Sequence, residues 1–83
     1  MRRPSVYGQP LSEGQLAALR LAATGHTSQQ IAARLGTTTT GINLRFAEAA
    51  VRLGARSRTH AVVLAIRHGY IDIQYLDLER PAA

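Results

Sequence analysis

The fold of this chain is decided by residues 27–53, which read TSQQIAARLGTTTTGINLRFAEAAVRL. Ala32 is a small residue at a position where two helices can cross closely, and Gly36 follows it by four residues. Glycine tolerates a positive φ without a Cβ penalty, so Gly36 suits a tight turn at a helix end. Ile42 then supplies an apolar anchor near the start of the next helix. This spacing predicts a helix-turn-helix.

Capping residues mark where the helices are expected to begin. Ser12 with Gln15, and Thr27 with Gln30, have the spacing of a capping box, in which two side chains satisfy free backbone N–H groups at a helix start. Ser57 is a further candidate cap. Because glycines follow most of these segments, the expected helices cover about residues 12–24, 27–36, 39–53 and 58–68. The chain is therefore predicted to be all-α, with four helices.

Apolar residues recur at helical spacing in these segments and define the expected core. The residues expected to face inward are Leu16, Leu19 and Ala23 in the first helix and Ile42, Phe46, Ala49 and Leu53 in the third. A chain of 83 residues is long enough for one domain with a small core, and at this size association with a partner often adds stability.

The fourth helix contains six apolar residues in a row, at positions 61–66. A helix that packs on one face needs about half of these inward, whereas a helix that packs on two faces needs nearly all of them. Ala61, Leu64 and Ala65 are expected to face the core. The alternatives for the other face are a second subunit, which we favour, and the C-terminal tail. The predicted dimer interface consists of Val62, Val63 and Ile66.

The landmarks on either side of the helix-turn-helix resemble the LuxR/GerE family of DNA-binding domains. They are Leu11-Ser12, Leu19-Arg20-Leu21, Ala23-Thr24-Gly25, Ile31-Ala32, Leu35-Gly36, Ile42, Leu53-Gly54, Arg56-Ser57-Arg58-Thr59 and Ala61-Val62. The resemblance implies a four-helix domain whose third helix enters the major groove of DNA and whose fourth helix forms a dimer. It places the domain at residues 11–70, after an arm at 1–10 and before an acidic extension at 71–83.

By this resemblance, positions 43, 44 and 47 are where side chains meet base edges. Asn43 has the groups for a bidentate contact to adenine, and Leu44 suits the methyl group of thymine. Ala47 is short enough to contact a methyl group or to permit close approach. The alternative for Asn43 is an ordinary solvated helix residue.

Candidate phosphate contacts surround this reading face. A helix N-terminus favours anions, and arginine side chains bind phosphate oxygens. Capping is the alternative role for the threonines, and the two roles are compatible. The candidates are Arg45 and Arg52 beside the face, Thr38, Thr39 and Thr40 at the start of the third helix, and Arg56 and Arg58 at the start of the fourth.

The chain departs from the family pattern at five positions. The family usually has glutamate, threonine, lysine, histidine and asparagine where this chain has Gln15, Gly41, Asn43, Arg45 and Glu48. Glycine in the first turn costs about 1 kcal/mol of helix stability relative to alanine. Glu48 places a negative charge near phosphate, although Arg52, four positions later, is a possible partner. Gly41 and Glu48 support the alternative of a protein-interaction module with a degenerate DNA-reading helix.

The charge distribution favours a polyanionic partner such as double-stranded DNA. The chain carries a formal net charge of +5, and all ten of its basic residues are arginine. Residues 1–71 hold nine of these arginines against two acidic residues, whereas residues 72–83 hold one against three. Arg2 and Arg3 of the arm are further candidates to reach a groove, and a disordered basic terminus is the alternative of equal weight.

Other classes of function are disfavoured by what the sequence lacks. With no cysteine there is no disulfide framework or cysteine-ligated metal site. His60 and His68 are about 12 Å apart along one helix, too far to share a metal. We therefore expect no enzyme, cofactor, metal or small-molecule ligand, and no apolar run long enough for a membrane span. We expect a cytoplasmic protein, which is either a single-domain regulator or a piece of a longer one.

Overall fold

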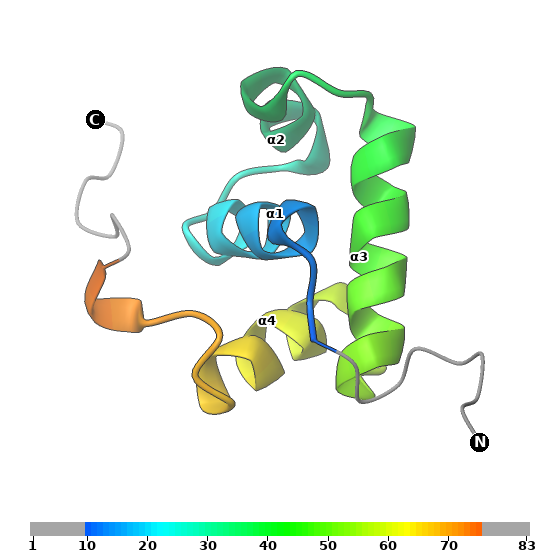
Figure 1. Ribbon diagram of the computed structural model, residues 1–83. Coiled ribbons are helices and arrows are strands. Elements are labelled where there is room, and N and C mark those ends of the chain that lie inside the picture. Colours follow the sequence, from blue (N-terminus) through cyan, green and yellow to red (C-terminus); the bar gives the residue numbers. More distant parts are fainter. Residues whose placement is uncertain (1–9, 76–83) are drawn as a thin grey trace.

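The structure is a computed structural model that describes residues 10–75 (Figure 1). The helices are α1 (Glu13–Ala23), α2 (Ser28–Leu35), α3 (Thr39–Leu53) and α4 (Arg58–Arg67), followed by the short 3₁₀ helix η1 (Ile73–Tyr75). None of the described residues lies in a β-strand. The prediction of an all-α fold with four helices is confirmed. Most of the predicted arm and residues 76–83 of the predicted extension lie outside the described residues.

The helices begin at the residues that the caps predict. The Ser12 hydroxyl accepts from the backbone N–H of Gln15 at 3.1 Å, and the Gln15 side chain accepts from the N–H of Ser12 at 3.0 Å. Thr27 and Gln30 repeat this exchange at 3.1 and 2.9 Å. Ser57 caps α4. Each cap typically contributes about 1 kcal/mol, so local sequence alone fixes most of the helix starts.

The turn between α2 and α3 has the predicted geometry. Gly36 lies in the left-handed region, with φ 70° and ψ 36°, and its N–H donates to the carbonyl of Ala32. The N–H of Thr37 donates to the same carbonyl at 3.0 Å. Thr38 then caps α3, because its hydroxyl accepts from the N–H of Gly41 at 2.9 Å. The two helices of the helix-turn-helix are therefore joined by three residues, 36–38.

The long helix α3 lies across the other three helices, and α1 lies between α2 and α4 (Figure 1). The predicted inward stripe of α3 is confirmed, since Ile42, Phe46 and Ala49 are buried and Leu53 is half-buried against the core. In α1 the buried face is centred on Ala18 and Leu19, together with Gln15, and the predicted Ala23 is only half-buried. Helix α1 contacts α2, α3 and α4, and these contacts together bury the face that carries Ala18 and Leu19.

The most deeply buried residues of helix α4 are two small ones. Ala61 and Ala65 are fully buried, as predicted, which lets the α4 backbone approach the core closely. The prediction for Leu64 is wrong in part, because this residue is half-buried and does not belong to the residues packed on the core cluster. After α4 the chain turns back, and the side chain of Ile71 closes the core at 2% exposure. Ile71 therefore belongs to the buried core.

Candidate nucleic-acid interface

The outer face of α3 is open to solvent. Its exposed residues include Thr40, Asn43 and Ala47, and also Leu44 and Val51, whose side chains are 57% and 51% exposed. Figure 1 shows α3 along one edge of the domain, with the other helices packed on one side only. The buried stripe of α3 forces these residues outward, as helical periodicity predicts. Their predicted contacts to base edges are compatible with this placement and remain predictions.

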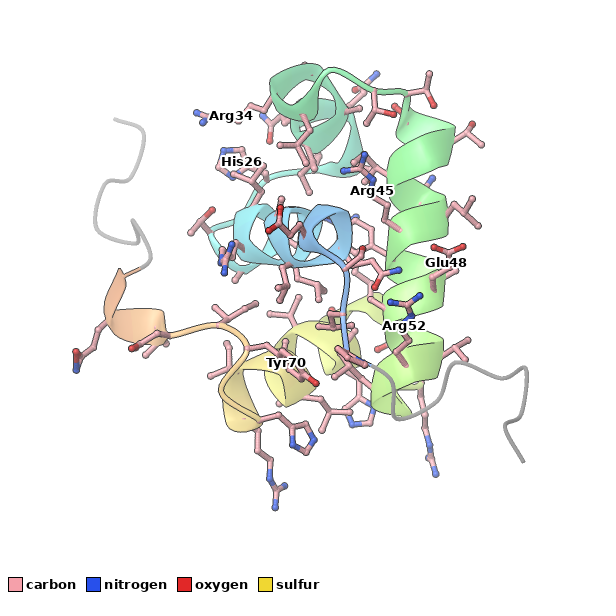
Figure 2. The ribbon with its side chains drawn as sticks, viewed as in Figure 1. His26, Arg34, Arg45, Glu48, Arg52 and Tyr70 are labelled. Atoms are coloured by element: carbon pink, nitrogen blue, oxygen red, sulfur yellow. The ribbon has the colours of Figure 1, made fainter. Side chains whose placement is uncertain are left out.

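The two arginines predicted to flank this face are turned toward the body of the domain (Figure 2). Arg45 is half-buried and donates from a terminal guanidinium nitrogen to the carbonyl of Gly14 at 3.4 Å. A side chain at Gly14 would crowd it, because a Cβ there would lie 3.3 Å from the Arg45 Cζ. Arg52 is also half-buried and donates to the carbonyl of Pro10 at 2.8 Å. Both arginines therefore hold α3 against the start of α1.

A hydrogen bond links two of the positions at which the chain departs from the family pattern. The Gln15 side chain is 3% exposed, and its Nε2 donates to the Glu48 carboxylate at 3.2 Å. Glu48 thus has its partner on α1, and not in the residue four positions later on its own helix. The family pattern of glutamate and asparagine at these positions is also a carboxylate–amide pair. In this chain the amide lies on α1 and the carboxylate on α3, whereas the family pattern has them the other way round.

The predicted phosphate contact Arg58 is half-buried and turned toward the domain. Its guanidinium donates to the carbonyl of His26 at 3.0 Å and to the hydroxyl of Ser28 at 2.6 Å, and its Cζ lies 4.2 Å from the centroid of the Phe46 ring. The Ser28 hydroxyl in turn lies 2.9 Å from the Oδ1 of Asn43. Arg58 therefore ties α4 to the start of α2 and, through Ser28, to the reading face of α3.

The remaining phosphate candidates are exposed. Thr38, Thr39 and Thr40 stand at the start of α3, where Thr38 also serves as the cap. Arg56 precedes α4 and is exposed, while its backbone N–H donates to the His60 ring at 3.0 Å. These four residues need no internal contact to be broken before they meet a phosphate.

Sequence reasoning missed the residues that position the candidate face. Ser28 is the first residue of α2, and its sequence context marks it only as a neighbour of the Thr27 cap. Gly14 and Pro10 act through backbone carbonyls, and a carbonyl carries no signal in the residue type. Only Gln15 and Glu48 could have been found from the sequence, because both depart from the family pattern and an amide can donate to a carboxylate.

The predicted dimer residues on α4 differ in exposure. Val63 is 53% exposed, whereas Val62 and Ile66 are half-buried and pack partly against the core. A second subunit would therefore meet Val63 first, with the other two residues at the edge of the contact. The dimer itself remains a prediction.

The fold and the exposed face of α3 define a helix-turn-helix domain, in which α2 and α3 are joined by the Gly36 turn and supported by α1 and α4. The family model for bacterial regulatory proteins of the LuxR family matches residues 9–65, well over half of the chain. The chain belongs to this family, whose helix-turn-helix domain is that of DNA-binding transcription regulators. No curated protein matches the chain significantly. In the described residues, no helix is both long and apolar enough to cross a membrane.

Proposed function

We propose that the chain is a transcription regulator that binds double-stranded DNA with the outer face of α3 in the major groove, in the cytoplasm where bacterial DNA lies. The observation that carries the proposal is the exposure of Asn43, Leu44 and Ala47 on one face of the second helix of a LuxR-type helix-turn-helix. A polar amide, an aliphatic side chain and a short side chain together suit the donors, acceptors and methyl groups of base edges.

Phosphate contacts are divided between two groups of residues. Arg56 and the threonines at the start of α3 are exposed and meet the backbone directly. Arg45 and Arg52 first hold α3 in place, and each still has donors for a phosphate because a guanidinium carries five N–H groups. Arg58 is committed to three contacts inside the domain and acts as a positioning residue.

The assembly that we propose is a two-fold dimer through α4, centred on Val63. A two-fold axis between two α4 helices places the two α3 helices on one duplex in related positions. The half-sites of such a dimer lie about 34 Å apart, one turn of DNA. An exposed valine between half-buried neighbours supplies the apolar centre for this contact.

The test is a titration of labelled random-sequence duplex with the protein at several salt concentrations, read by fluorescence anisotropy. Binding through phosphates gives a log–log slope of about −0.9 per neutralised phosphate, so several contacts give a steep dependence. A matched titration with Asn43→Ala should keep this slope, because a base contact adds little on random DNA. Absence of binding to duplex at low salt would refute the proposal.

A protein-interaction module is the second candidate, and one observation favours it. Leu44, Ala47 and Val51 form an apolar stripe along the outer face of α3, with the carboxylate of Glu48 beside it. Such a stripe suits the apolar face of a partner helix as well as a groove lined by thymine methyl groups. The same titration separates the two functions, because a module of this kind shows no salt-dependent retention on duplex.

A further inference from the structure

Arg58 occupies a fixed position between three helices. One of its terminal nitrogens donates to the carbonyl of His26 at 3.0 Å, and the other donates to the hydroxyl of Ser28 at 2.6 Å. Its guanidinium carbon lies over the ring of Phe46, 4.2 Å from the centroid. Two hydrogen bonds and a stacking contact orient the guanidinium. Arg58, the first residue of α4, therefore determines how the hydroxyl of Ser28, the first residue of α2, is hydrogen-bonded.

The direction of the hydrogen bonds follows from the number of protons. A guanidinium only donates, so the Ser28 hydroxyl accepts from Arg58 and keeps a single proton of its own to donate. The Asn43 side chain lies 2.9 Å from that hydroxyl. If its carbonyl oxygen faces Ser28, the serine proton has an acceptor. If its NH₂ group faced Ser28, the hydroxyl oxygen would accept from both Arg58 and Asn43, and the serine proton would have no acceptor within this cluster. The Oδ1 of Asn43 is accordingly held against Ser28.

This orientation decides what Asn43 presents to a base. With Oδ1 turned toward Ser28, the opposite end of the planar amide is Nδ2, which carries two donors and no acceptor. A bidentate contact to adenine needs both ends of the amide, because adenine presents an acceptor and a donor in the major groove. Guanine presents two adjacent acceptors, N7 and O6, whereas cytosine presents only a donor. A side chain that turns its donor end toward the base matches guanine best and cytosine worst.

We propose that Arg58 and Ser28 set the base preference of the domain by fixing the Asn43 amide, so that Asn43 reads the acceptor edge of guanine. This inference rests on the proposed function, because it requires α3 to lie in the major groove. It assigns a specificity-determining role to two residues that do not themselves touch a base. It also replaces the adenine contact that the sequence suggested for Asn43.

The test begins with selection of bound duplexes from random DNA by the wild-type protein and by Asn43→Ala. The base position whose preference disappears in Asn43→Ala belongs to Asn43, and we expect guanine there. The dissociation constants for two duplexes that differ only at this base pair should then favour guanine over adenine by about fivefold or more, the lower end for a specific base contact. In Ser28→Ala, which frees the amide to rotate, this ratio should fall to within about twofold or reverse. Ser28→Thr keeps a hydroxyl and should keep the ratio.

A second measurement tests the hydrogen bonds without DNA. The side-chain amide resonances of Asn43, followed by NMR in the free protein, should shift in Ser28→Ala and stay in place in Gln29→Ala, a change at the neighbouring exposed position of α2. Adenine at the Asn43-dependent position, an unchanged base ratio in Ser28→Ala, or unmoved amide resonances would each overturn the inference while leaving DNA binding intact. A wild-type protein that binds no duplex would overturn the proposed function and this inference together.

Discussion

Reversing one half of the Gln15–Glu48 pair should destabilise the domain by a measurable amount. Gln15→Glu keeps an oxygen for the capping bond to Ser12 but replaces the amide donor, 3.2 Å from Glu48, by a carboxylate oxygen. The lost bond is one to a charged group, worth about 1.5–3 kcal/mol. The new carboxylate is also placed in a position that is 3% exposed and next to a like charge. Because Glu48 is exposed, its rotation into solvent relieves most of the repulsion.

The expected loss is therefore about 2–3 kcal/mol in the free energy of unfolding, measured by urea denaturation at pH 7 with circular dichroism as the probe. In a domain of this size such a loss corresponds to a decrease in Tm of roughly 10 °C or more. The matched control is the exchange of both partners, Gln15→Glu with Glu48→Gln, which restores a carboxylate–amide pair with its ends reversed. It should lie within about 1 kcal/mol of wild type, and Glu48→Gln alone should cost less than Gln15→Glu. A double variant no more stable than Gln15→Glu would refute the reasoning, as would a Gln15→Glu variant of wild-type stability.

The remaining predictions concern the turn, the start of α3, the dimer and the phosphate contacts. Gly36→Ala should cost about 1–2 kcal/mol, because φ is 70° there, and a thermal melt at wild-type Tm would contradict this. Gly41→Ala should be nearly neutral in the same melt, since a helix-propensity gain of about 1 kcal/mol is offset by a Cβ that would lie 2.9 Å from the Thr37 hydroxyl. Val63→Glu should give a folded monomer in sedimentation, with much weaker DNA binding; an unaltered mass would place the dimer contact elsewhere. Arg56→Ala should lower the salt slope of DNA binding by about one, and an unchanged slope would remove this residue from the phosphate contacts.

The helix boundaries were predictable from the sequence because caps act locally. Ser12 and Thr27 each fix a helix start through residues three positions away, and Gly36 fixes a helix end through its own φ. The misassigned burial positions have a different cause. Whether Ala18 or Ala23 faces the core depends on where α3 and α4 cross α1, and the burial of Ile71 depends on how the chain returns after α4. Those are properties of the packed domain, and the spacing of apolar residues in the sequence does not reveal them.

The candidate site was predictable in its exposed part and unpredictable in its support. The outward position of Asn43 follows from the buried stripe of α3, which any helical wheel reveals. The position of an arginine side chain does not follow in the same way, because the side chain is long and its acceptors here are backbone carbonyls. Arg45 and Arg52 reach carbonyls 31 and 42 residues away in sequence, at Gly14 and Pro10. From charge composition alone, these arginines are expected to be free to contact phosphates. In the structure both donate to backbone carbonyls of the same domain.

The departures from the family pattern bear on whether α3 still reads DNA. A reading helix released from its function would accumulate changes on its exposed face without matching changes elsewhere. Here the departure at Glu48 is matched by the departure at Gln15, while Asn43 accepts a hydrogen bond from Ser28 and Arg45 donates to the carbonyl of Gly14. Each of these partners lies on a different helix from the changed residue, so the contacts keep α3 fixed against α1 and α2. Such compensation preserves the orientation of α3 as a whole, which matters for a helix that must fit a groove and much less for an apolar stripe that meets an adaptable partner. This pattern favours an altered base preference over a lost one.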